Sequence, residues 1–401
     1  MSSASHRLSR RRWLQASAGL VAATASSRLL ALPTTALGGE PGPDSPRFLM
    51  VFLRGAYDAC NVLVPAFSDF YFEARPTIAV PRGALRSLND GWGLHPALAG
   101  PLGAYLDNRE LGFVPFVGIP GTTRSHFDSQ DRLEYGLDGR EPLRPPAQGL
   151  LYRLAQSLPA PVSPLAFTQI RPLALRGPGV LPNFPLQGGA RQPLDPQLRG
   201  ALRELYADRS VAALGQALES GLDLQEQDRL DRQQDQAMAH AQPADRKAVT
   251  ARGFAQDAST VARQMRRHFN VGFVDIGGWD THVGQGGETG QLANRLAELG
   301  EGLATYASAM GDAWARTTVV VVSEFGRTFR ENGSRGTDHG YGTAYWVMGG
   351  GLNRPAVFGE GASGTVLTAD TLNDHRDLPI RTDYRVLLRQ IARERLGVDW
   401  S

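Results

Sequence analysis

The 401-residue chain predicts an α/β fold with a mostly parallel central sheet flanked by helices. Four short apolar runs lie far apart in the sequence, and each is typical of a strand buried on both faces. Each run leads into a polar segment with an acid or a histidine, the pattern expected at the carboxyl edge of a parallel sheet. Apolar residues from Leu292 to Met310 recur at spacings of four and three, which predicts a long amphipathic helix and a βαβ unit.

The N-terminal segment has the features of a twin-arginine export signal. Three arginines at positions 10–12 precede Trp13, and an Ala-rich apolar stretch follows from Ala16 to Ala25. The alternative is a basic arm before an anchoring helix, but the stretch is too short and too weakly hydrophobic to span a bilayer. We therefore predict a signal peptide over residues 1–36, contact with the twin-arginine translocation machinery, and a periplasmic or secreted protein without a permanent membrane span.

Composition and charge exclude several classes of protein. Hydrophobic residues make up 42% of the chain and charged residues 20%, as in ordinary globular proteins. Residues 1–36 contain five arginines and no acid, so removing them changes the formal net charge from +2 to −3, which argues against a nucleic-acid partner. Cys60 is the single cysteine, so an exported protein of this sequence must be stabilised by its core or by a bound metal.

We expect one α/β domain over residues 45–401, with an insertion at about 140–265. Proline is dense from Pro142 to Pro185, and Gln, Arg, Asp and Ala dominate from Gln192 to Arg267. Leucines at helical spacing occur in the second of these stretches. The insertion is thus predicted to be a loop-rich segment followed by helices that cap the site.

The first predicted strand runs from Arg47 to Leu53 and is followed by Gly55 and Asp58. A buried strand, a glycine and then an acid is the arrangement expected for a ligand at the carboxyl edge of a sheet. We predict that Asp58 binds metal. The alternative is that Asp58 caps the next helix.

The second predicted strand runs from Leu111 to Val117, and a loop rich in glycine and hydroxyl groups follows it. This loop carries Ser125 and His126 just before a predicted helix from Ser129 to Tyr135. A loop in this position can bind an anion at the helix N-terminus and can present a nucleophilic hydroxyl. Ser125 and His126 are therefore the predicted catalytic residues, and the alternative for Ser125 is a helix N-cap.

The third predicted strand, Val271 to Ile276, leads to Asp280 and His282. Side chains two residues apart on extended backbone point to the same side, so both residues can face one ion. We predict that both are metal ligands. The alternative is a polar turn that caps the next helix.

The fourth predicted strand runs from Thr318 to Val322 and consists entirely of β-branched residues. Glu324 follows directly, and a glycine-rich loop then carries Asp338 and His339 before a short strand from Ala344 to Met348. Carboxylate oxygens and imidazole nitrogens are the donors that bind divalent metals. Glu324, Asp338 and His339 are therefore predicted metal ligands.

Adjacent side chains on extended backbone point to opposite faces, which makes the pair Asp338 and His339 unusual as ligands. The glycines around the pair permit backbone conformations that turn both side chains inward. We expect both to face the same cavity as Asp58 and Asp280. The alternative is that His339 stacks on Tyr341, away from that cavity.

These motifs together resemble the bacterial domain-of-unknown-function family 1501. The resemblance is carried by GAYDACN, RSHFDSQD, GGWDTH and VVVVSEFGRT followed by GTDHG, and it covers nearly the whole chain after the signal. The family is similar in fold to the alkaline phosphatase and sulfatase superfamily, whose sites use two metals, a first-strand Asp, a Ser or Thr nucleophile and later Asp/His pairs. The resemblance implies that Asp58 matches the first Asp, that Ser125 is the nucleophile, and that Asp280-His282 and Asp338-His339 are the two pairs.

We therefore expect one or two divalent ions, which can be Zn, Mg, Mn or Ca, in an exported hydrolase of phosphate or sulfate esters. Its partner would be a small-molecule ester or anionic substrate. The alternative is a non-catalytic exported binding protein that retains a degraded site, because Asp280 and His282 are closer together than the superfamily's usual pair and Glu324 replaces a more usual Asp.

Overall fold

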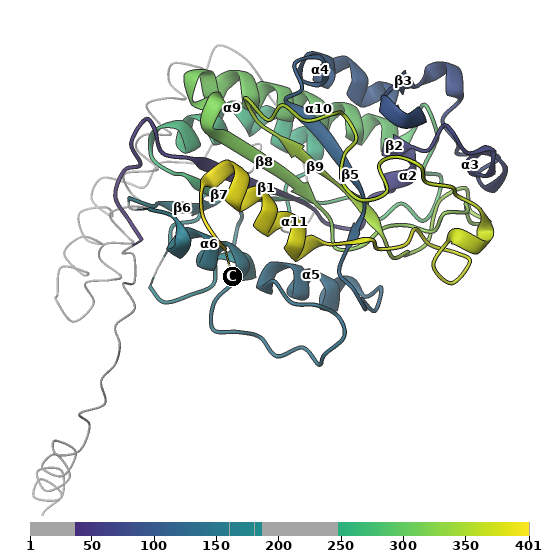
Figure 1. Ribbon diagram of the computed structural model, residues 1–401. Helices are drawn as coiled ribbons and strands as arrows, with labels where there is room; N and C mark the ends of the chain where they lie inside the picture. The colour runs from purple at the N-terminus through teal and green to yellow at the C-terminus, as the bar shows by residue number, and fades with distance from the viewer. Residues whose placement is uncertain (1–36, 160, 180, 187–247, 401) are drawn as a thin grey trace, which may run out of the picture. The chain divides into compact units, whose positions relative to one another are not determined.

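A seven-stranded sheet forms the centre of the computed structural model, which describes residues 37–159, 161–179, 181–186 and 248–400. The strand order is β10-β5-β9-β8-β1-β7-β6 (Figure 1). The strands are β1 (Arg47–Leu53), β5 (Leu111–Gly118), β6 (Pro164–Ala166), β7 (Val271–Ile276), β8 (Thr317–Val322), β9 (Thr343–Met348) and β10 (Thr382–Asp383).

The sheet is mostly parallel, which confirms the predicted fold class. β1 pairs in parallel with β7 and β8, and β6 pairs in parallel with β7. β9 pairs antiparallel with both β8 and β5, so β5 runs in the same direction as β8. The carboxyl ends of β1, β5, β7 and β8 therefore lie along one edge of the sheet.

The predicted strands form because their apolar side chains are buried on both faces. All seven residues of β1 and all six residues of β8 are buried. Alternate residues enter different cores: Leu49 and Val51 of β1 join one apolar cluster, while Phe48 and Met50 join the other. This period of two follows from the pleat of an extended strand.

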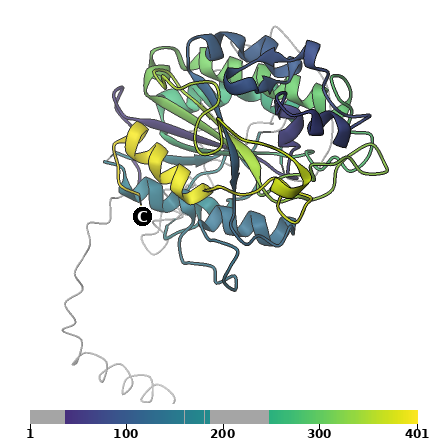
Figure 2. The same cartoon turned by 45° about the vertical axis from the view of Figure 1, so that its right-hand side comes forward.

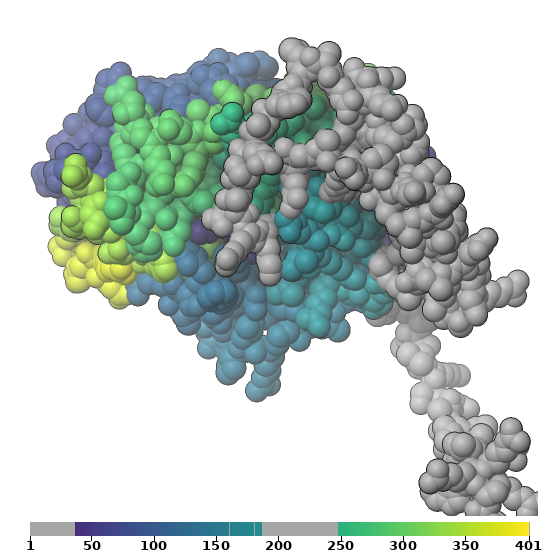
Figure 3. All heavy atoms as spheres, turned by 180° about the vertical axis from the view of Figure 1, so that it is seen from behind, coloured from purple at the N-terminus to yellow at the C-terminus, as the bar shows by residue number. Residues whose placement is uncertain are grey.

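Helices cover both faces of the sheet (Figures 1 and 2). One layer contains α4 (Pro96–Asp107), α9 (Ala251–Arg267) and α10 (Gln291–Met310), and the other contains α5 (His126–Tyr135), α6 (Leu150–Ser157) and α11 (Tyr384–Ile391). The apolar stripe predicted for α10 is buried. From behind, the green surface of residues near 300 adjoins the blue surface of residues near 100, where α10 packs on α4 (Figure 3).

A small antiparallel sheet lies beside the main one, with the order β2-β4-β3. Its strands are β2 (Leu63–Val64), β3 (Arg86–Ser87) and β4 (Gly93–Leu94), and the short helices α2 (Ala59–Val62) and α3 (Asp69–Ala74) flank β2 in the chain. Short 3-10 helices occur at Arg82–Ala84, Asn89–Gly91, Leu173–Leu175, Gly311–Arg316 and Ala369–Thr371, and a π-helical segment occurs at Ala392–Leu396. Within the described part of the chain, every helix is too short or too polar to cross a membrane.

The segment expected as an insertion shares its described residues with the main layers. β6 is an edge strand of the central sheet, and α9 packs against α10. The helical stretch predicted between residues 192 and 247, and the signal predicted over residues 1–36, lie outside the described residues.

Candidate metal centre

Polar residues from four segments meet beyond the carboxyl ends of the parallel strands. His126 begins α5 after β5, the loop after β7 carries Asp280 and His282, and Glu324 follows β8. Because β9 is antiparallel, its first residue lies at the same edge, and the loop that enters it carries His339. The topology thus positions these side chains as the sequence pattern predicts.

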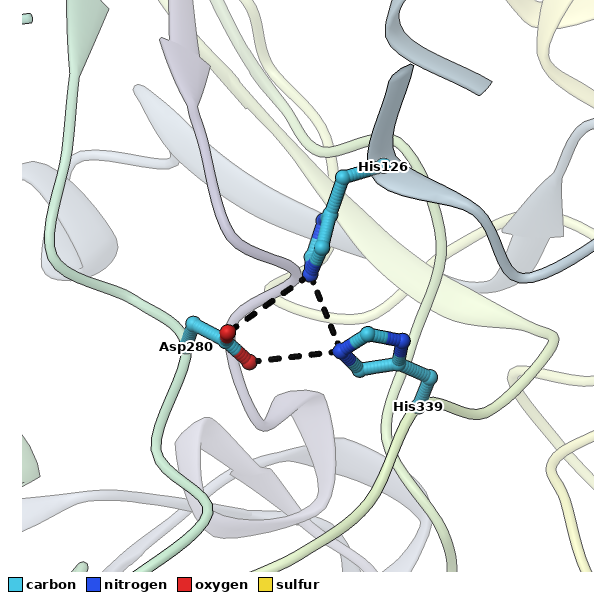
Figure 4. Close-up of side chains that lie close together, drawn as sticks. All are labelled: His126, Asp280 and His339. Carbon is cyan, nitrogen blue, oxygen red and sulfur yellow. Dashed lines mark hydrogen bonds and ion pairs between the residues drawn. The ribbon is translucent and has the colours of Figure 1, made fainter. Parts of the chain in front are cut away.

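The centre of the site is formed by His126, Asp280 and His339, whose polar atoms face one another (Figure 4). His126 Nε2 lies 3.0 Å from His339 Nε2 and 3.8 Å from Oδ2 of Asp280. His339 Nε2 lies 3.4 Å from Oδ1 of Asp280. One potential ligand atom from each residue lies within 4.8 Å of the other two, which is the spacing of donors that can bind one metal ion.

His282 contacts the same centre from the loop after β7. Its Nε2 atom lies 3.0 Å from Nε2 of His339 and 2.9 Å from Oδ1 of Asp280. Three imidazoles and one carboxylate therefore converge, and we call His126, Asp280, His282 and His339 the histidine cluster.

Each histidine of the cluster forms a hydrogen bond through its Nδ1 atom, and the partner in each case is an oxygen that can only accept. His126 Nδ1 donates to Oε1 of Glu324 at 2.7 Å, and His282 Nδ1 donates to Oδ1 of Asp338 at 3.2 Å. His339 Nδ1 donates to the backbone carbonyl of Arg124 at 3.1 Å. With Nδ1 protonated, the neutral rings direct the Nε2 lone pairs toward the cluster, which is one of the two tautomers that metal-binding histidines use.

Glu324 is fully buried and orients His126 through a dense set of hydrogen bonds. Its carboxylate accepts from Gly55 N at 2.9 Å, from Gln130 Nε2 at 3.0 Å and from Ser323 Oγ at 2.9 Å, in addition to His126. Burial acts to raise the pKa of Glu324, but the hydrogen bonds from His126 and Gln130 outweigh it and lower this pKa. The carboxylate is therefore ionised, and hydrogen bonds from neighbouring groups occupy its oxygens.

The charges within the cluster shift the protonation of its members. Burial disfavours the imidazolium of His126, but hydrogen bonds to Asp280 and Glu324 outweigh burial and raise the pKa of His126 to about 9. Burial likewise disfavours the carboxylate of Asp280, yet hydrogen bonds from His126 and His339 and the charge of Arg327 hold its pKa below its usual range. At neutral pH and without a metal, the cluster therefore carries the carboxylate of Asp280 and a proton on His126.

Arg327 is a buried link between the loops of the site. Its guanidinium donates to the backbone carbonyls of Gly55 at 2.7 Å, Ala56 at 2.6 Å and Thr337 at 3.1 Å. It also forms an ion pair with Asp280. Arg327 thereby fixes the carboxylate of Asp280 relative to the loops after β1 and before β9.

Ser125 occupies the N-cap position of α5, as the alternative for this residue expected, but its side chain makes no capping hydrogen bond. The residue is exposed and directly precedes His126. Arg124 before it has a φ of 61°, in the left-handed region that residues other than glycine seldom adopt. The Arg124 guanidinium pairs with Asp377 at 2.6 Å and Asp374 at 3.1 Å, which anchors this turn.

The structure does not bring Asp58 to the histidine cluster. Both carboxylate oxygens of Asp58 accept hydrogen bonds from Arg75, at 2.5 and 3.0 Å, and Oδ2 also accepts from Gln285 Nε2 at 2.6 Å. Gln285 in turn accepts from the hydroxyls of Thr281 and Thr337, which neighbour Asp280 and Asp338 in the chain. Asp58 is thus linked through Gln285 to the two loops that carry Asp280 and Asp338.

The predicted ligands other than Asp58 divide into two groups. Asp280, His282 and His339 lie in the cluster, and His126, predicted as a catalytic residue, lies there with them. Glu324 and Asp338 bind the Nδ1 atoms of histidines. Tyr341, the alternative partner of His339, accepts a hydrogen bond from Gly121 N, while the His339 ring packs against Phe325.

Three supporting residues were not identified from the sequence: Gln130, Arg124 and Arg327. Gln130 lies four residues after His126, and α5 begins at His126, three residues before the predicted helix start, so a helix extended to His126 would have placed both on one face. The two arginines give no such signal, because their partners are backbone carbonyls and residues far away in the chain.

A family model described as "Protein of unknown function (DUF1501)" matches residues 187–390, which is half of the 401-residue chain. No curated protein matches the chain.

Several solved structures resemble the chain at low sequence identity. The C-terminal periplasmic domain of EcEptC from Escherichia coli has a TM-score of 0.42 at 10% identity, covering 92% of this chain and 87% of that one. Ps i-CgsB in complex with k-i-k-neocarrahexaose has a TM-score of 0.38 at 10% identity, covering 88% and 72%. A protein in the alkaline phosphatase superfamily from Vibrio parahaemolyticus has a TM-score of 0.35 at 10% identity, covering 87% and 71%. Because these scores lie below 0.5, we derive function from the chain's own residues.

Proposed function

We propose that this chain, which belongs to the DUF1501 family of proteins of unknown function, is an exported metal-dependent hydrolase of phosphate or sulfate esters. One observation carries the proposal: the Nε2 atoms of three histidines point at one another while every Nδ1 atom donates elsewhere. Lone pairs 3.0 Å apart repel unless a proton or a cation lies among them.

The donor set of the histidine cluster fits a divalent transition metal. In a tetrahedral site with metal–nitrogen distances of about 2.0–2.1 Å, the ligand atoms lie roughly 3.3 Å apart. The nitrogen–nitrogen contacts of 3.0 Å are close to that spacing. Imidazole with one carboxylate suits zinc and its first-row neighbours better than calcium or magnesium, which prefer oxygen ligands.

We expect one ion rather than two. The carboxylate of Asp58 is neutralised by Arg75, and those of Glu324 and Asp338 are bonded to histidine Nδ1 atoms. A second cation would have to displace one of these partners. The contacts of these three carboxylates therefore favour one ion, where the sequence predicted one or two.

Because the four side chains complete a tetrahedral set, the ester would have to add one of its oxygens as a fifth ligand, and a cation bound by the cluster would then polarise that oxygen. Ser125 Oγ is the proposed nucleophile, since it is exposed, free of a capping bond and adjacent to His126 at a helix N-terminus that favours an anion. Attack by Oγ on phosphorus or sulfur breaks the bond to the alcohol oxygen, and the alcohol leaves with the proton that the Ser125 hydroxyl gives up. Water then attacks the same atom, frees the phosphate or sulfate and restores the hydroxyl of Ser125.

The test is the metal content of mature protein exported by its own signal, together with hydrolysis of aryl phosphates and aryl sulfates. We expect about one ion per chain, loss of activity on chelation and recovery on metal addition. Trapping a phosphorylated or sulfated Ser125 peptide would distinguish this nucleophile from water. Protein without bound metal that hydrolyses neither ester under any metal supplement would rule the proposal out.

A second candidate is a non-catalytic binding protein, and the ion pair between Arg327 and Asp280 favours it. This pair balances the charge of Asp280 without a metal. In that case the cluster would be a polar network, and Ser125→Ala and Asp338→Ala would leave ligand binding intact. Metal in wild-type protein that disappears in His339→Ala would exclude this candidate.

We also propose export by the twin-arginine route, on the basis of the arginines at positions 10–12 and the weakly apolar stretch after them. Arg10→Lys combined with Arg11→Lys should retain the unprocessed precursor in the cytoplasm. Fractionation and blotting of the tagged protein measure this. Unchanged processing of the double variant would contradict the assignment.

A further inference from the structure

Two apolar residues that directly follow histidines of the cluster in the chain are unusually exposed. Phe127 is 86% exposed and Val283 is 70% exposed. Among the large hydrophobic residues in the described part of the chain these are the highest values, and the next is Val366 at 65%. Burial of a Phe or Val side chain stabilises a fold, and neither residue contributes much of this stabilisation to the protein.

Both residues directly follow a histidine of the cluster. Phe127 follows His126 in the first turn of α5, and Val283 follows His282 in the loop after β7. The two histidines each approach Nε2 of His339 to 3.0 Å, so the segments that carry Phe127 and Val283 meet at the cluster. They are separate in the chain, and no secondary-structure rule makes both apolar.

A single exposed apolar residue is common on protein surfaces and needs no explanation. Here the two most exposed ones of the described residues are each the next residue in the chain after a histidine of the cluster, on two different segments. Ligand sites commonly combine apolar walls with a few polar groups that fix orientation. The polar groups here are the cluster and Ser125, and the apolar walls would be Phe127 and Val283.

We propose that Phe127 and Val283 bind the apolar alcohol part of the ester, so that the site prefers aryl or bulky apolar esters to esters of small polar alcohols. This inference rests on the proposed ester hydrolase activity and specifies its substrate class. The charged phosphate or sulfate group would lie at the cluster, and the hydrophobic group would cover Phe127 and Val283. The free energy of that contact would come from apolar surface removed from water.

The experiment compares kcat/KM for naphthyl and glycerol esters of the same acid in the wild type, Phe127→Ala and Val283→Ala. We expect each substitution to lower kcat/KM for the naphthyl ester about tenfold, equivalent to about 1.4 kcal/mol, mainly through KM. The value for the glycerol ester should change less than twofold. Phe127→Trp, which keeps a large apolar side chain at this position, should retain the wild-type kcat/KM for the naphthyl ester.

Val386→Ala is the matched control, because Val386 is an exposed apolar residue on α11 that is not part of the cluster. It should leave both rates unchanged. Metal content of every variant is measured in parallel and should equal that of the wild type. An equal loss for both esters, or a loss of metal, would show that Phe127 and Val283 support the fold or the cluster and would overturn the inference.

The inference and the proposed activity can fail separately. If the wild type hydrolyses neither ester, calorimetric binding of naphthyl phosphate and naphthyl sulfate still tests the apolar contact, and an affinity unaffected by Phe127→Ala overturns it. Exposed apolar residues can instead bind a membrane surface. If both alanine variants lose sedimentation with phospholipid vesicles while both ester rates stay unchanged, the residues face lipid and the inference is wrong.

Discussion

Asp280 supplies the negative charge at the centre of the histidine cluster. Its carboxylate lies 2.9 Å from Nε2 of His282 and 3.4 Å from Nε2 of His339, and it pairs with Arg327. An asparagine keeps the shape of the side chain, but it removes the negative charge and replaces one accepting oxygen with a donating amide group. The Asp280→Asn substitution therefore tests the role of this charge without changing the volume of the side chain.

We predict that Asp280→Asn lowers metal affinity at least 100-fold and abolishes ester hydrolysis. The reason is that a neutral amide neither offsets the cation nor balances Arg327. Affinity is measured by competition with a chromogenic chelator. Asp374→Asn is the control, since Asp374 is an exposed acid whose ion-pair partner is Arg124; a similar loss in both variants would contradict the assignment.

The proton on His126 competes with metal. Because neighbouring carboxylates raise the pKa of His126 to about 9, the metal-free cluster carries a proton below that pH. Metal binding must release it, so apparent metal affinity should rise about tenfold per pH unit from pH 7 to about 9 and then level off. Chelator competition at several pH values measures the slope.

The same raised pKa has the opposite effect on the metal-free protein. The proton stabilises the folded state fully below pH 6.5, the ordinary value for histidine, and this stabilisation is lost as pH rises toward about 9. We expect the Tm of metal-free protein to fall over that window and the Tm of metal-loaded protein to stay level. A metal-free Tm that rises between pH 6.5 and 9 would show that His126 is not the titrating group.

At the scale of elements, the turn before α5 connects the C-terminal part of the chain to the cluster. Arg124 adopts a left-handed conformation and its carbonyl accepts from Nδ1 of His339. The buried carboxylate of Asp377 fixes the Arg124 guanidinium at 2.6 Å. Asp377 thus acts on His339 through Arg124 and is a positioning residue.

We predict that Arg124→Met and Asp377→Asn each weaken metal affinity by roughly 10- to 100-fold, the usual effect of losing a group that orients a ligand. Asp374→Asn, which removes the exposed partner of the same guanidinium, should have little effect. Affinity is again measured by chelator competition, with the Tm of metal-free protein as a check on folding. Equal affinities in all three variants would exclude this connection.

The sequence predicted the strands of the site well, because their signal is local. The β-branched and apolar runs at 47–53, 111–117, 271–276 and 318–322 match β1, β5, β7 and β8 to within one residue. β6 and β10 have two or three residues each, and pairing with neighbours rather than propensity defines them. The antiparallel direction of β9 is likewise a property of the sheet and not of its residues.

The sequence also identified which side chains gather at the sheet edge, but not their contacts. Glu324 is an acid at a strand end, as predicted, yet its carboxylate is buried and bonded to His126. The position of Asp58 depends on Arg75, which lies 17 residues further on with no spacing that links the two. Partners of this kind are set by tertiary packing, which a single sequence does not encode locally.

For the whole molecule, the pair of Asp58 and Arg75 connects distant parts of the fold. Arg75 also donates to the backbone carbonyls of Thr328 and Phe329, while Asp58 accepts from Gln285. Both charges are buried and fully hydrogen-bonded. Removing one partner leaves the other charge without compensation.

We predict that Asp58→Ala destabilises the protein by about 3–5 kcal/mol, because Arg75 would then be buried and unpaired. Urea unfolding of metal-free protein measures this value. Asp69→Ala is the control, since Asp69 forms an exposed ion pair with Arg82 and should change stability little. Equal effects of the two substitutions would refute the structural role of Asp58.

The antiparallel direction of β9 has one more consequence. Since β8 and β9 are neighbours that run in opposite directions, residues 323–342 leave the sheet and return to it at the same edge. This excursion contains Glu324, Arg327, Asp338 and His339, so a large part of the site is encoded in one uninterrupted stretch of gene. Recombination or design can exchange that stretch as a cassette between two fixed strands, and the chemistry of the site can change while the sheet beneath it is inherited intact.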